Sequence, residues 1–127
     1  MYYLPKSNNI ISVIEFPPKI VDYEKVYRVK KGSDVTIFVQ YEANPPPNDE
    51  WVVNSKIIKK SKHTKPTIDS MSANLTIKKT DNNDAGTYKL RLENNCGYTE
   101  IDIEVVILGK FNLLLSNLST IGYKLTF

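Results

Sequence analysis

Apolar and polar residues alternate in several short stretches of this chain, which is the period-two pattern of strands with one buried face. The pattern is clearest at residues 35–41 and 88–92, and it returns at residues 75–78 and 98–106. The inward-facing positions predicted from this alternation are Val35, Ile37, Val39, Tyr41, Leu75, Ile77, Tyr88, Leu90, Leu92, Ile101, Ile103 and Val105. Seven or so short strands separated by turns are typical of an antiparallel sandwich.

Two shorter apolar stretches precede these strands. Residues 19–21 and 26–30 are predicted to form edge strands, because Pro17-Pro18 excludes a helix and a sheet accepts proline only at its edge. Residues 61–70 are polar and show no alternation, so strand boundaries cannot be drawn there.

Turn residues separate the strands. Residues 81–84 are Asp-Asn-Asn-Asp, whose side chains bond nearby backbone, and Gly86 tolerates conformations that other residues avoid. Residues 94–97, Asn-Asn-Cys-Gly, predict a hairpin between the last two strands.

The spacing around this turn resembles a known signature. Asp84-x-Gly86-x-Tyr88-x-Leu90 is similar to the Asp-x-Gly-x-Tyr-x-Cys sequence of immunoglobulin domains, with Leu90 in place of the second cysteine. Residues 32–39 resemble the family's Gly-x-x-Val-x-Leu-x-Cys strand, with Val39 in place of the first cysteine.

The resemblance covers roughly residues 17–107. It implies that residues 17–108 form an all-β, immunoglobulin-like sandwich of the intermediate set (I-set) without the inter-sheet disulfide. It implies that Trp51 packs over Val39 and Leu90, where relatives carry the disulfide, and that Tyr88 forms a tyrosine corner. The structural core that we expect is Val39, Trp51, Leu75, Ile77, Tyr88 and Leu90, and the turn signature is Asp84 and Gly86.

Residues 1–16 are expected to be an arm or linker, with an accessory strand at residues 10–16 as the alternative. Residues 109–127 are expected to be a tail outside the sandwich, with docking on a sheet edge as the alternative.

Cysteine usage bears on the compartment. Cys96 is the only cysteine among 127 residues, so no internal disulfide can form. Small secreted β domains usually carry such bridges, which favours a reducing, cytoplasmic location. The alternative is that Val39 and Leu90 are ordinary core residues without bearing on location. The N-terminus shows no secretory signal and no run is apolar enough to span a bilayer, so we expect no membrane partner.

Charge and reactive residues give little support for other functions. A formal charge of +3 is too small to indicate a nucleic-acid partner. His63 is the single histidine and is expected to be an exposed loop residue, and neither it nor Cys96 has the spacing of a metal or catalytic site, so no cofactor and no enzymatic activity are expected. The lysines around His63 are either a solvated loop or a surface for an acidic partner. Arg91, Glu93, Glu100, Asp102 and Glu104 are expected on one charged outer face.

The hairpin and closing strand look most like the cysteine-poor modules of giant muscle proteins such as titin, twitchin and projectin. That resemblance implies a non-catalytic structural and binding module of the sarcomere, beside other immunoglobulin or fibronectin type III modules and in contact with myosin or other sarcomeric proteins. Such parent proteins often carry a protein kinase domain, whose motifs are absent here. The competing hypothesis is a module of an extracellular adhesion or receptor protein, for which Asn74-Leu75-Thr76 and Asn117-Leu118-Ser119 would be glycosylation acceptors.

Overall fold

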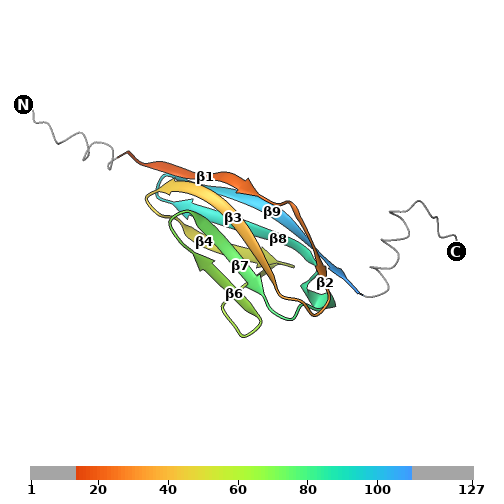
Figure 1. Ribbon diagram of the computed structural model, residues 1–127. Coiled ribbons are helices and arrows are strands. Elements are labelled where there is room, and N and C mark those ends of the chain that lie inside the picture. Colours follow the sequence, from red (N-terminus) through yellow and green to blue (C-terminus); the bar gives the residue numbers. More distant parts are fainter. Residues whose placement is uncertain (1–13, 110–127) are drawn as a thin grey trace, which may run out of the picture.

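The computed structural model describes residues 14–109, which form two stacked β-sheets (Figure 1). The first sheet has the strand order β1 (Phe16–Tyr23), β3 (Val35–Asn44), β7 (Ser72–Ile77) and β6 (Thr64–Ile68). The second has the order β2 (Val26–Lys30), β9 (Gly97–Leu108), β8 (Gly86–Asn94), β4 (Asn48–Val53) and β5 (Lys56–Ile57). A short 3-10 helix, η1 (Asn82–Asp84), precedes β8. The all-β sandwich expected from the sequence is confirmed.

One strand pair departs from the antiparallel expectation. β2 runs parallel to β9, with Val26 opposite Glu104 and Lys30 opposite Leu108. The reason lies in the chain path, since β1 and β2 are one extended segment that changes sheets near residues 24 and 25. β1 pairs with β3 up to Tyr23, and β2 then continues along the other sheet.

The point where β1 leaves the first sheet exposes a main-chain donor on β3. The last β1 pair joins Tyr23 to Val39, so the neighbouring N–H of Phe38 has no partner from β1. It donates instead to the hydroxyl of Tyr27 on β2, with a nitrogen–oxygen distance of 3.1 Å. This bond ties the two sheets together at the edge.

The core lies between the sheets. The six residues expected there are at most 2% exposed, and they are Val39, Trp51, Leu75, Ile77, Tyr88 and Leu90. Trp51 on β4 is directly opposite Leu90 on β8, while Val39 belongs to the other sheet and enters the same buried cluster. Among the remaining inward positions, Val35 and Ile101 are only partly buried.

Two boundaries differ from the sequence-based expectations. Phe16, which was expected to end the N-terminal arm, is the first residue of β1. The polar stretch without visible boundaries contains β6, which is held by main-chain pairing to β7 and buries little side-chain surface. Residues 1–13 of the arm, which include most of the accessory strand considered at residues 10–16, lie outside the described residues. The same holds for the tail from residue 110, which includes Asn117.

Candidate interaction surfaces

The turn before β8 is fixed by a tyrosine corner. The hydroxyl of Tyr88 donates to the main-chain carbonyl of Asp84, four residues earlier, at 2.6 Å. Burial, with the nearby carboxylates of Asp84 and Asp81, raises the pKa of Tyr88 to about 12. A neutral phenol is therefore built into this end of the core.

The same turn is capped by its own carboxylates. Asp84 Oδ2 accepts from the main-chain N–H of Asp81 at 2.8 Å, and Asp81 Oδ1 accepts from Asn83 at 2.8 Å. Gly86 follows at φ +151°, where a Cβ would lie 3.4 Å from Val53 Cγ2 and would strain the backbone. The two predicted signature residues thus hold the backbone that positions Tyr88.

His63 differs from the exposed loop residue that was expected. Its Nε2 lies 2.7 Å from Asp84 Oδ1, and its side chain is 42% exposed, compared with 11% for Asp84. The pair joins the loop before β6 to the turn before β8. Because Asp84 also caps η1, His63 is part of a structural network, and no nucleophilic side chain completes a catalytic arrangement with it among the hydrogen bonds of residues 14–109.

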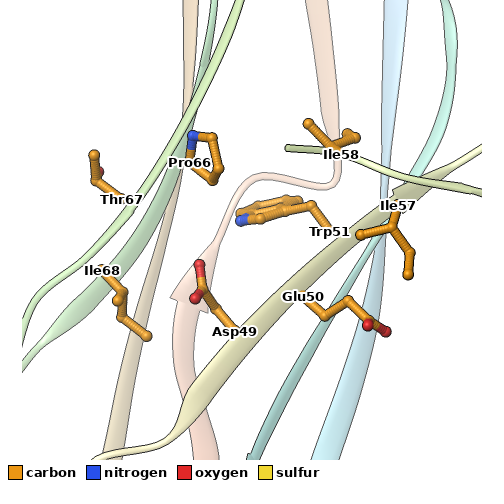
Figure 2. Close-up of a pocket in the computed structure, with 8 residues that line it drawn as sticks. All are labelled: Asp49, Glu50, Trp51, Ile57, Ile58, Pro66, Thr67 and Ile68. Atoms are coloured by element: carbon orange, nitrogen blue, oxygen red, sulfur yellow. The ribbon is translucent and has the colours of Figure 1, made fainter. Parts of the chain in front are cut away.

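A cavity of about 230 Å³ opens beside Trp51, at the edge where β4 and β5 face β6 (Figure 2). Its lining residues are Asp49, Glu50, Trp51, Ile57, Ile58, Pro66, Thr67 and Ile68. The nitrogen-bearing edge of the indole points between Pro66 and Asp49 in Figure 2. That nitrogen is buried and has no hydrogen-bond partner within the described part of the chain. Its two carboxylates, Asp49 and Glu50, have no His, Ser or Cys beside them among the lining residues.

Pro66 protects the free edge of β6. The main-chain bonds from Lys78 to His63 and from Asp69 to Ser72 set the register, so alternate residues of β6 turn their backbone groups away from β7. Pro66 is one of these outward residues and has no N–H to offer. An added strand would miss a bond at the centre of this edge.

Part of the predicted charged face is assembled around Arg91. Arg91 Nη1 lies 3.0 Å from Glu100 Oε2, and Nη2 lies 3.4 Å from Glu93 Oε1. The guanidinium also covers the ring of Tyr98, 3.8 Å from its centroid, a contact that the sequence pattern did not identify. The hydrogen bond that Arg91 donates to Glu100 is the strongest influence on the pKa of Arg91, and together with the charge of Glu93 it raises this pKa above its usual value. A second hollow, of about 220 Å³, lies between this cluster and the carboxylates of Asp49 and Glu50.

The remaining candidate residues are dispersed. Cys96 is exposed in the two-residue turn of the β8–β9 hairpin. Asn74 lies in the middle of β7, half-buried, with its amide nitrogen donating to Ser72 Oγ at 3.1 Å. Residues 14–109 hold no group of three His, Cys, Asp or Glu side chains that could bind a metal ion. The same part of the chain has no helix long and apolar enough to cross a membrane.

Comparisons with known proteins agree with this architecture. The chain is 40% identical to "Titin" of Drosophila melanogaster over 101 residues, which is 79% of this chain and 1% of the fly protein. It is 32% identical over 93 residues to the "Titin homolog" of Caenorhabditis elegans, covering 72% of this chain and, to the nearest per cent, 0% of the nematode protein. The chain thus spans a very small part of these relatives.

A solved tandem of titin immunoglobulin domains has the same fold, with a TM-score of 0.72 and 23% identity over 76% of this chain and 51% of that one. The family model described as "Immunoglobulin I-set domain" matches residues 18–107, which include all nine strands except the first residues of β1 and the last residue of β9. The chain therefore belongs to the immunoglobulin I-set domain family.

Proposed function

We propose that this chain is a non-catalytic module of a titin-like muscle protein, in which it links and spaces neighbouring modules along a sarcomeric filament. The observation that carries the proposal is the 40% identity to Drosophila titin over 101 residues. The proposal includes an intracellular location and a role in thick-filament organisation and elasticity.

The residues of the core also support an intracellular location. Val39 and Leu90 stand where the immunoglobulin signature has cysteines, and both are fully buried. Fully burying one such side chain contributes roughly 1.5–3 kcal/mol, which is comparable to the roughly 2–5 kcal/mol that a native disulfide supplies. A domain stabilised in this way does not depend on an oxidising compartment.

The shape of the module suits a linear array. β1 begins and β9 ends at opposite ends of the sandwich (Figure 1). Neighbouring immunoglobulin or fibronectin type III modules would therefore follow one another along its long axis. The titin structure named above likewise contains immunoglobulin domains in tandem. Myosin and other sarcomeric proteins are the partners that we propose for such an array.

The location can be tested by imaging. An antibody against this module, applied to permeabilised muscle, is expected to give regular bands in register with the thick filaments. Labelling of intact, non-permeabilised cells without such bands would contradict the proposal and would favour an extracellular adhesion protein.

A further inference from the structure

A basic hollow lies at the end of the sandwich where β6 begins and β7 ends. Its volume is about 430 Å³, and the four residues that line it are Lys62, His63, Lys78 and Lys79. Lys62 and His63 come from the lysine-rich loop noted in the sequence, whereas Lys78 and Lys79 are more than a dozen residues later. Pairing of β6 with β7 brings the two segments together.

The backbone beneath this hollow is firmly held. The N–H of Lys78 donates to the carbonyl of His63 at 2.8 Å, which continues the β6–β7 ladder by one pair. The N–H of Lys79 donates to Asp34 Oδ1 at 2.9 Å, and His63 is held by Asp84 at 2.7 Å. A partner that binds here has little backbone to order, which lowers the entropy lost on binding.

Lys79 has an unusual conformation. Its φ is +50°, in the left-handed region that glycine or asparagine normally fills, so the backbone of a lysine there is strained. Backbone strain of this kind often accompanies a functional position. A lysine at this position brings a third ammonium group to the hollow despite the strain.

The lysine charges of the hollow are not paired with carboxylates in the described part of the domain. Within residues 14–109 the three ion pairs involve His63 and Arg91, and none involves a lysine. Lys62, Lys78 and Lys79 are exposed, so their charges face solvent. Such a cluster attracts a group of closely spaced negative charges.

From these observations we propose that the hollow formed by Lys62, His63, Lys78 and Lys79 binds an acidic peptide segment of a partner protein. A nucleic acid fits less well, because none of the lining residues is a Phe, Tyr or Trp on which bases could stack. The binding site does not depend on which parent protein carries the module.

The site can be tested by titrating the isotope-labelled protein with a short peptide that contains a central run of Glu and Asp. The amide resonances of Lys62, His63, Lys78 and Lys79 are expected to shift. Raising the salt from about 0.05 to 0.3 M should weaken binding, because the contacts are exposed charges. A peptide with Gln and Asn in place of the acids is expected to leave the spectrum unchanged.

Three variants locate the site. Lys62→Glu is expected to weaken binding about tenfold, and Lys79→Gly about threefold, since each exposed charge contributes up to about 1 kcal/mol. Glycine suits the positive φ of Lys79, so this variant removes the ammonium group without adding strain. Lys19→Glu on β1 makes the same charge change outside the hollow and is expected to alter binding less than twofold.

Equal weakening by Lys19→Glu and Lys62→Glu would overturn the proposal, since it would show attraction by net charge alone. Peptide-induced shifts confined to other surfaces would overturn it too. If single-stranded DNA of equal charge displaced the peptide from these four residues and bound more tightly, the proposed class of partner would be wrong. None of these results would alter the sarcomeric banding expected for the module.

Discussion

Tyr88 and Asp84 are joined by a 2.6 Å hydrogen bond from a buried phenol to a main-chain carbonyl four residues earlier. The bond anchors the turn that carries the acidic cap, the glycine and the first residues of β8. Without it, the Asp84 carbonyl loses its partner at the edge of the core.

Tyr88→Phe is therefore expected to lower the free energy of unfolding by about 1–3 kcal/mol, the usual effect of leaving a buried acceptor unsatisfied. Chemical denaturation monitored by Trp51 fluorescence measures the change. Tyr98→Phe serves as the control, because Tyr98 is 57% exposed and loses no hydrogen bond of the core. A larger effect at Tyr98 than at Tyr88 would contradict the account of the corner.

Alkaline pH provides a second test of the same residue. The pKa of Tyr88 is raised from 10.0 to about 12 by burial and neighbouring carboxylates, so the unfolded chain loses this proton at lower pH than the folded protein. The contribution of Tyr88 to the free energy of unfolding is therefore complete below pH 10, and it declines as the pH rises toward about 12. Burial also raises the pKa of Tyr41, which acts in the same direction.

Denaturation curves recorded from pH 9 to about 12 should therefore show a steeper loss of stability for the original protein than for Tyr88→Phe. The Tyr41→Phe variant provides a comparison in which the contribution of Tyr88 is retained. Identical slopes for the original protein and Tyr88→Phe would exclude Tyr88 as a source of the alkaline transition.

Gly86 is expected to tolerate no side chain without strain. Gly86→Ala would hold a Cβ at φ +151° and 3.4 Å from Val53 Cγ2, so we expect a loss of about 1–3 kcal/mol in thermal or chemical unfolding. Gly109→Ala is the matched control, because a Cβ there meets no atom within 4 Å. Equal stability of the two variants would mean that the turn before β8 adjusts to the added methyl group without measurable strain.

Leu90 tests the packing between the sheets. Leu90→Ala removes a fully buried side chain opposite Trp51, and the resulting cavity is expected to cost about 2–5 kcal/mol. Ile57→Ala is the control, since Ile57 is 56% exposed. Its expected effect is below about 0.5 kcal/mol, as for most surface substitutions.

The strands that bury one face could be predicted from the sequence, and those that bury little could not. β3 and β8 follow period-two alternation because every second side chain enters the core. β6 has no such pattern, since it is an edge strand held by main-chain bonds, and Thr64, Lys65 and Thr67 carry no apolar signal.

The interaction surfaces were harder to predict, because they depend on contacts between distant segments. His63 and Asp84 are 21 residues apart, and nothing in either local sequence marks their pairing. Likewise, the loop lysines acquire Lys78 and Lys79 as neighbours only through the β6–β7 register. The position of Tyr98 under Arg91 follows from β8–β9 pairing in the same way.

The central claim is that aliphatic side chains from the two sheets, Val39 and Leu90, occupy the place of the disulfide of related domains. The most direct measurement is the mass of a protein that carries Val39→Cys and Leu90→Cys together, after oxidation and thiol labelling. Because Cys96 is a free, exposed thiol, it is replaced by serine in the same protein. We predict that the oxidised, folded protein is lighter than the reduced protein by the mass of two hydrogens and takes up no thiol label. A folded protein with two labelled thiols after unfolding would contradict the claim.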